Sequence, residues 1–119
     1  MGIFNASTAT PEAFTKVHGH ALIDGEEVIA VFKTIRDFIA FTSWRVIYVD
    51  VQGLTGSKKE YLSVPYRSIN AFAIESAGTF DLDGEIKLYL SGHEPITFRI
   101  ARDSDVGAMQ NLLAAKLGA

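Results

Sequence analysis

The sequence predicts a mainly β domain with some α structure: a seven-stranded antiparallel barrel capped at one open end by a C-terminal helix. Seven runs rich in Val, Ile and aromatic residues follow one another at intervals of about 8–15 residues. The apolar residues then change to the period of a single amphipathic helix. The 119 residues, of which 48% are hydrophobic, suit one domain with its own core, so we expect a single domain over residues 1–119.

The first element that we expect is a short extra helix at about 11–22, after a polar, flexible lead-in at 1–10. Thr10 is a favourable N-cap residue, and Pro11 suits the first helical position. Asp24–Gly25 then ends the helix and turns the chain. The apolar residues at helical spacing are Phe14, Val17, Ala21 and Leu22.

The seven strands come next, with polar or glycine-containing breaks between them. Gly53 and Gly56 lie in the loop after the third strand, where positive φ angles let a long hairpin bend tightly. Pro65 stands near the end of the fourth strand, which suits an edge strand because proline cannot donate to a ladder. The strands are expected at 27–35, 37–42, 44–51, 59–66, 69–76, 85–91 and 96–100.

The last element is a helix at 103–117 that we expect to lie over one open end of the barrel. Asp103 or Ser104 suits its N-cap, with Asp105 favourable in the first turn. A meander of strands cannot cover its own open ends, and one apolar helix face can cover one of them. The apolar stripe consists of Val106, Met109, Leu112, Leu113 and Leu117.

Composition excludes several classes of protein. The absence of cysteine excludes a disulfide framework, a thiolate nucleophile and a Cys-based metal site. A formal net charge of −3 argues against nucleic acid as a partner, because phosphates call for a surplus of Lys and Arg. No signal-peptide pattern is present, and no apolar run approaches the roughly 20 residues of a membrane span, so we expect a cytoplasmic protein.

No motif predicts catalysis or a cofactor. No Ser lies in a Gly-x-Ser-x-Gly elbow, and Gly53–Gly56 is too short for a phosphate loop. His18 and His20 stand two residues apart, which on a helix points them in different directions, and His93 falls in a predicted turn. We interpret all three as surface histidines, and we expect no enzyme, no metal centre and no cofactor.

An acidic cluster at the start of the sixth strand is the one partial metal motif. Asp81, Asp83 and Glu85 alternate with other residues, as ligands in a calcium loop do. An EF-hand has its Gly at the sixth position between helices, whereas Gly84 occupies the fourth position between predicted strands. The sequence leaves open whether this cluster binds a cation or simply faces solvent.

Five segments, in order and at matching spacing, resemble the bacterial pleckstrin-homology (PH) domain family of small stand-alone proteins. The resemblance covers roughly residues 27–117, and the N-terminal helix matches only loosely. Ser43–Trp44 departs from the polar pair that the family usually has before Arg45. The matching segments are Phe32–Thr42 (FKTIRDFIAFT), Arg45–Asp50 (RVIYVD), Gln52–Gly56 (QGLTG), Tyr61–Ile69 (YLSVPYRSI) and Ala77–Leu88 (AGTFDLDGEIKL).

The resemblance implies a PH-like barrel, ring-forming homo-oligomers with pentamers among them, and no catalytic residues. PH folds that bind inositol phosphates carry basic residues on the first two strands and the loop between them. Here that region is Lys33–Asp37, a tight turn in which Asp37 offsets part of the charge. Lys58, Lys59 and Arg67 could form a small basic patch elsewhere, but we expect neither phosphoinositide nor membrane binding.

The leading functional hypothesis is a non-enzymatic scaffold or interaction protein that assembles with copies of itself. Several strands are apolar on both faces, which is more than one small barrel interior needs and is typical of a buried surface between subunits. Open sheet edges also favour pairing with a neighbour. The residues expected at such contacts are Trp44, Tyr48 and Tyr61.

The alternative is a peptide-binding module. Phosphotyrosine-binding relatives of the PH fold add a ligand strand at the sheet edge between the fifth strand and the C-terminal helix. Met109 is an adaptable side chain of the kind that grooves use, although it is more commonly a core residue. The residues expected along this groove are Ile69, Phe72, Ile74, Met109 and Leu113.

Overall fold

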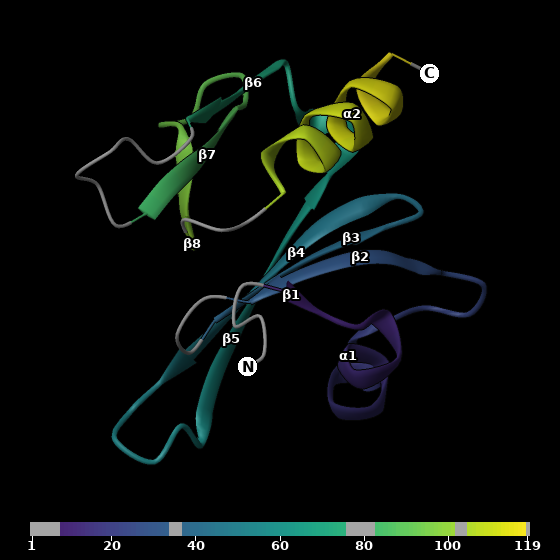
Figure 1. The fold of residues 1–119 in the computed structure, drawn as a ribbon, viewed down its shortest axis with the longest axis vertical. Helices are drawn as coiled ribbons and strands as arrows, with labels where there is room; N and C mark the ends of the chain where they lie inside the picture. The colour runs from purple at the N-terminus through teal and green to yellow at the C-terminus, as the bar shows by residue number, and fades with distance from the viewer. Residues whose placement is uncertain (1–7, 34–36, 76–82, 102–104, 119) are drawn as a thin grey trace.

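A computed structural model of the chain describes residues 8–33, 37–75, 83–101 and 105–118. They form two antiparallel β-sheets, two α-helices and two short 3-10 helices (Figure 1). The elements are β1 (Thr8–Ala9), α1 (Pro11–His18), η1 (Gly19–Ala21), β2 (Val28–Lys33), β3 (Phe38–Thr42), β4 (Arg45–Gln52), β5 (Lys58–Pro65), η2 (Tyr66–Ser68), β6 (Ala71–Glu75), β7 (Asp83–Tyr89), β8 (Ile96–Ala101) and α2 (Val106–Leu117).

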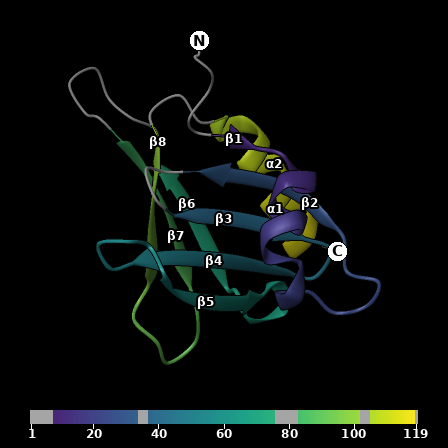
Figure 2. The same ribbon diagram turned by 90° about the horizontal axis from the view of Figure 1, so that it is seen from below.

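The strands divide between a five-stranded sheet, β1-β2-β3-β4-β5, and a three-stranded sheet, β6-β7-β8. All seven expected strands are present, within a few residues of their expected bounds. The expectation of one closed barrel was wrong, because no ladder among the described residues joins the two sheets. Instead the sheets stack, with their strands crossing at a large angle (Figure 2), as in orthogonal sheet packing.

The N-terminal lead-in contains a strand that the sequence did not indicate. Thr8 and Ala9 pair with Phe32 and Val31 of β2, so part of this lead-in adds a fifth strand to the larger sheet and an eighth to the described strands as a whole. Thr10 follows as the N-cap of α1, and its hydroxyl accepts a hydrogen bond of 3.0 Å from the Ala13 amide. That cap confirms the predicted start of the helix at Pro11.

The main core lies between the two sheets and beneath α2. Alternate residues of each strand point inward, which buries Phe41 and Val46 from one sheet and Ile86 and Phe98 from the other. Met109 and Leu113 of α2 are completely buried against this core, and the rest of the predicted stripe packs around them. The predicted helix and its apolar stripe are therefore confirmed, but the helix covers the core between two sheets and not the open end of a closed barrel.

The first turn of α2 differs from the prediction in one detail. Asp105, which we expected inside the helix, is its N-cap, and its carboxylate accepts a hydrogen bond of 3.0 Å from the Ala108 amide. Asp103 and Ser104 lie outside the described residues. Neither α1 nor α2 is long and apolar enough to cross a membrane, within the described residues.

The chain covers both faces of the larger sheet. Figure 1 shows α1 on one side of this sheet, and the smaller sheet with α2 on the other. The outer face presents a second core, in which Phe14 of α1 is buried against β2, β3 and β4. The buried strand residues of this second core are Val31, Ala40, Ile47 and Val49.

Each sheet ends in strands that have a neighbour on one side only. Within the described residues, β5 pairs with β4 alone, and β6 and β8 pair only with β7. β5 is eight residues long, and Pro65 is its last residue, as its sequence position suggested. β1, which pairs only with β2, is the fourth edge among the described strands, and such edges can offer backbone donors and acceptors to a neighbour.

Candidate functional site

The outer face of the larger sheet, which the sequence suggested as a surface between subunits, is already covered by the chain itself. Phe14 is 2% exposed, and it packs across β2, β3 and β4. The apolar character of these strands on both faces therefore has an internal explanation: one face meets α1 and the other meets the smaller sheet. The buried centre of this face is therefore not available to another copy.

His18 is the second residue of α1 that contacts this face, and its burial corrects the expectation of a surface histidine. Its ring is 2% exposed, lies 4.9 Å from the Phe14 ring and 5.4 Å from the Phe38 ring (centroid distances), and its Nδ1 is 2.9 Å from the Tyr61 hydroxyl. Val17, expected on the buried stripe, is 62% exposed instead. The buried face therefore follows an i, i+4 pair, Phe14 and His18.

Burial lowers the pKa of His18, because a charged imidazolium loses its hydration there. Electrostatic interactions with Lys59 and then with His20 lower the pKa of His18 further. His20 is exposed and contacts the edge of the Tyr61 ring, at 5.6 Å between centroids. A neutral, buried His18 thus holds the end of α1 on the edge strand β5.

Arg45 and Glu26 form a buried ion pair that the sequence analysis did not identify. The guanidinium contacts both carboxylate oxygens, with Nε–Oε2 and Nη2–Oε1 distances of 2.8 Å. It also donates to Ser63 Oγ at 2.8 Å and to the Ala21 carbonyl at 2.6 Å. Thr42 Oγ1 donates to the same carboxylate at 2.6 Å.

This network holds neighbouring segments of the fold together and is not arranged as a reactive site. Burial by itself raises the pKa of Glu26, but hydrogen bonds from Arg45, Thr42 and the Ile23 amide favour the anion and lower the pKa to about 2. Both carboxylate oxygens are occupied, so no acceptor remains for a substrate. An Arg directly before the mainly apolar run Val46–Val49 was the available sequence signal.

The three aromatic residues expected at contacts between copies all have partners inside the chain. Tyr48 stacks on Phe98 with centroids 4.6 Å apart, and its hydroxyl donates to Asp37 at 2.6 Å. Tyr61 contacts His18, as described above. Trp44 lies 4.8 Å from the Arg45 guanidinium, and its buried indole Nε1 has no hydrogen-bond partner among the described residues. Their contact with another copy stays a prediction.

The residues expected along a peptide groove are mostly in the main core. Ile69 is 6% exposed, and Met109 and Leu113 are completely buried. Phe72 and Ile74 are half-buried and pack against the same cluster. α2 packs against β6 and η2, so the chain fills the side-chain pockets that a peptide would need, and only the backbone edge of β6 is left.

The residues singled out as candidate ion or lipid ligands are dispersed in the structure. Among the described residues, no group of three His, Asp or Glu side chains is arranged to hold a metal ion. Asp81 lies outside those residues, and of the acidic cluster only the half-buried Glu85 has a described side chain. Lys58 and Lys59 begin β5, whereas Arg67 follows its other end, so the three do not form one patch.

The segment Lys33–Asp37, where lipid-binding PH folds carry basic residues, also lacks a basic cluster in its described part. Lys33 Nζ lies over the Phe38 ring, 5.2 Å from its centroid. The Asp37 carboxylate accepts hydrogen bonds from Tyr48 and, at 2.9 Å, from the Val51 amide. Arg36 lies outside the described residues. Burial, followed by the nearby Asp37 carboxylate, raises the pKa of Tyr48, so its hydroxyl stays a hydrogen-bond donor.

Two relatives match the sequence of this chain along nearly their whole length. The chain is 45% identical over 113 residues to the uncharacterized protein YjqA of Bacillus subtilis (strain 168), covering 93% of this chain and 90% of that protein. It is 32% identical over 117 residues to the uncharacterized protein YozO of the same organism, covering 98% of each.

A solved structure of a DUF1696 family protein with a pleckstrin-homology domain, from Shewanella loihica PV-4, has a TM-score of 0.82. It is 37% identical in sequence, with 95% of this chain and 97% of that chain covered. A pleckstrin-homology domain from Shewanella amazonensis SB2B has a TM-score of 0.78 and 40% identity, with 97% and 94% covered. The family model described as "Bacterial PH domain" matches residues 1–117. The chain therefore belongs to the bacterial PH domain family.

Proposed function

We propose that this protein is a non-enzymatic scaffold that assembles with copies of itself through its unpaired strand edges. The observation that carries the proposal is β5, an eight-residue edge strand whose only partner among the described strands is β4. Its two ends carry features that discourage pairing, Lys58–Glu60 at one end and Pro65 at the other. The four residues between them are uncharged, and Leu62 is 37% exposed there.

The covered outer face strengthens this choice of surface. Because α1 covers the centre of that face, we choose the free edge of β5 as the main surface for a neighbour. The resemblance found in the sequence supports a ring, and five copies is the size that we propose. A closed ring satisfies each subunit's open edges without leaving one at the end of a chain of copies.

The native mass in solution tests this proposal. Light scattering over a wide concentration range is expected to give a stable multiple of 13.0 kDa. Leu62→Lys adds a charge to the free edge and is expected to lower the mass. Ala115→Lys adds the same charge on the exposed surface of α2 and is expected to leave the mass unchanged. A wild-type protein that stays monomeric at high micromolar concentration would contradict the proposal.

A peptide-binding module is the second candidate, and the unpaired edge of β6 is the observation that favours it. A peptide added there would gain backbone hydrogen bonds, with side-chain contacts limited to half-buried residues such as Phe72 and Ile74. A random-peptide library displayed on phage tests this candidate. Enrichment of one motif, lost on Ala73→Pro in β6, would support it, and a monomeric wild type would move it ahead of the scaffold.

The scaffold proposal includes a cytoplasmic location and neither nucleic acid nor phosphoinositide as a ligand. The net charge of −3 and the dispersed basic residues support the second part, that neither nucleic acid nor phosphoinositide is a ligand. Sedimentation with phosphoinositide vesicles tests the second one. Binding that is lost on Lys58→Glu/Lys59→Glu would overturn it.

A further inference from the structure

The β4–β5 hairpin projects beyond the rest of the larger sheet (Figure 1). Its loop bends at Gly53 and Gly56, which have φ angles of +83° and +73°. Leu54, between them, is fully exposed. One exposed leucine is ordinary by itself, but this one stands at the tip of a protruding element, and its neighbours on the hairpin carry charge.

Two lysines follow the tip directly. Lys58 pairs with Gln52 in the first rung of the hairpin ladder, and Lys59 with Val51 in the second. Both lysines are exposed. The first carboxylates, Asp50 and Glu60, come one rung further back. The hairpin therefore presents an apolar tip with a positive collar.

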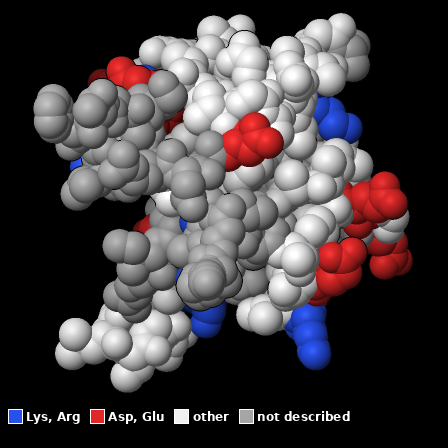
Figure 3. All heavy atoms as spheres, in the orientation of Figure 1, with Lys and Arg blue, Asp and Glu red and all other residues white. Residues whose placement is uncertain are grey.

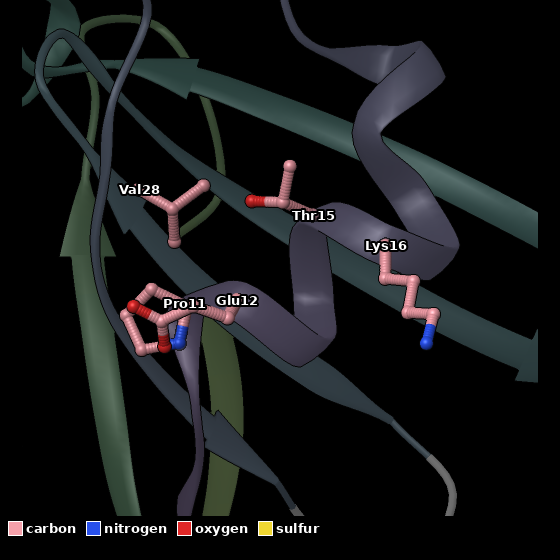
Figure 4. Close-up of a pocket in the computed structure, with 5 residues that line it drawn as sticks. All are labelled: Pro11, Glu12, Thr15, Lys16 and Val28. Carbon is pink, nitrogen blue, oxygen red and sulfur yellow. The ribbon is translucent and has the colours of Figure 1, made fainter.

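A hollow of about 450 Å³ lies between α1 and β2 (Figure 4). It is an open depression on the surface rather than an enclosed pocket. Val17, which follows the lining residue Lys16 in α1, is apolar and 62% exposed. The lining residues are Pro11, Glu12, Thr15, Lys16 and Val28.

Carboxylates lie in or beside the lining of this hollow. Glu12 is part of the lining, and the exposed Glu27 directly precedes the lining residue Val28. Lys16 is a cation of the same lining. Figure 3 shows acidic side chains gathered on the side of the molecule where α1 and the segment after it lie. An apolar tip followed by two lysines suits a hollow lined by Pro11 and Val28 with carboxylates beside them.

The hairpin tip and the hollow lie at opposite ends of the same sheet. Val28 pairs with Thr42, beside the turn that leads into Arg45 at the start of β4, and the tip follows Gln52 at the end of β4. An eight-residue strand is about 25 Å long, so the two surfaces of one chain cannot meet. The tip of one copy can meet the hollow of the next copy. Such a head-to-tail contact produces a ring where the rotation between copies closes.

We propose that the β4–β5 hairpin of one copy places Leu54 in the hollow between α1 and β2 of the next copy. Lys58 and Lys59 then face the carboxylates of Glu12 and Glu27. The contact rests on the proposed self-assembly and adds a second pair of surfaces to the free edge of β5. It uses two different surfaces of the chain, so each copy offers one of each to its neighbours.

Disulfide trapping is the most direct test, because the chain has no cysteine of its own. The double variant Leu54→Cys/Thr15→Cys has one thiol at the tip and one beside the hollow. Oxidation is expected to give a ladder of covalent multimers that ends at the ring size. A bridge within one chain is out of reach, since bridged Cα atoms lie within about 7 Å of each other. Leu54→Cys/Ala115→Cys, with its second thiol on α2, is the matched control and is expected to give no ladder.

The native mass provides an independent test. Leu54→Ser is expected to weaken association about tenfold or more, because it removes the buried apolar side chain, whereas Thr55→Ser in the same loop leaves it unchanged. Lys58→Glu/Lys59→Glu is expected to dissociate the assembly, and adding Glu12→Lys/Glu27→Lys to the same chain to restore it. These residues are exposed, and circular dichroism verifies that each variant stays folded.

The outcomes separate this contact from the broader proposal. A wild-type assembly whose mass is insensitive to Leu54→Ser, with no tip-to-hollow ladder, overturns the hairpin contact and leaves self-assembly standing. A monomeric wild type overturns both. A ladder together with restoration by the reversed charges supports the contact as stated.

Discussion

The His18 Nδ1 of α1 lies 2.9 Å from the Tyr61 hydroxyl of β5. These residues are 43 positions apart in the chain. Their contact fastens the N-terminal helix to the edge strand on which the proposed self-assembly depends. The helix, the outer face of the sheet and the assembly edge are therefore one connected unit.

The buried His18 predicts that stability falls on acidification. Burial and Lys59 lower its pKa from the ordinary 6.5, so the folded protein binds fewer protons than the unfolded chain. The contribution of His18 is fully present above about 6.5 and is lost as the pH falls below that value. Urea unfolding is expected to show a lower free energy of unfolding at about pH 5 than at about pH 7.

The histidine variants identify the source of this pH dependence. His18→Gln is expected to reduce the slope between about pH 7 and pH 5, whereas the exposed His20→Gln retains it. Stability that rises on acidification, or a slope unaffected by His18→Gln, would contradict the assignment.

The Arg45–Glu26 pair predicts a large cost when one partner is removed. Arg45→Met leaves the Glu26 carboxylate, whose side chain is 0% exposed, without its cation, and is expected to lower the free energy of unfolding by about 3–5 kcal/mol. Arg45→Met/Glu26→Leu is expected to recover part of that loss, because no unpaired charge remains. Arg67→Met, at an exposed position, is the control and is expected to have little effect.

The contribution of the same pair to stability is lost in a lower pH range than the contribution of His18. Glu26 has its pKa lowered from 4.5 to about 2, so its contribution is present above about 4.5 and is lost as the pH falls toward 2. Acid unfolding followed by circular dichroism is expected to begin at higher pH in Glu26→Gln than in the wild type. An identical acid transition in the two proteins would refute this role.

Phe14 predicts how strongly α1 is attached. Phe14→Ala removes the 2%-exposed ring from the outer core and is expected to cost about 3–5 kcal/mol. Hydrogen exchange is expected to quicken first in α1 and at the outer face of β3 and β4, before the β7–β8 pairs. Val17→Ala, at a 62%-exposed position three residues along the same helix, is the matched control and is expected to cost well under 1 kcal/mol.

Two glycines predict changes of opposite sign. Gly53 has a φ of +83° with open space around it, so Gly53→Ala costs about 1 kcal/mol through the backbone alone. Gly107 lies in the first turn of α2, and a Cβ there meets Asp105 Oδ1 at an ordinary 3.6 Å. Gly107→Ala is therefore expected to stabilise the protein by about 0.5–1 kcal/mol. Thermal unfolding of both variants measures the difference, and a shift in the same direction would contradict this account.

Local patterns in the sequence were enough to predict the helices and strands of this protein and the faces on which most of their side chains lie. Alternation in Val46–Val49 places successive residues on opposite faces of a strand whatever that strand packs against. The spacing of Met109 and Leu113 likewise defines one helix face, and both residues are completely buried. These are local consequences of backbone geometry, so the pattern of the residues is enough to predict them.

What covers each face of the sheet and of α1 depends on the tertiary structure. An apolar outer face on β3 and β4 looks the same in sequence whether a second copy or α1 covers it, and α1 covers it here. Phe14 allows either Val17 or His18 as its neighbour on the next turn, and the position of Tyr61 selects His18. The separation into two sheets and the Arg45–Glu26 pair arise in the same way. Each depends on segments distant in the chain meeting in space, and no local period records such a meeting.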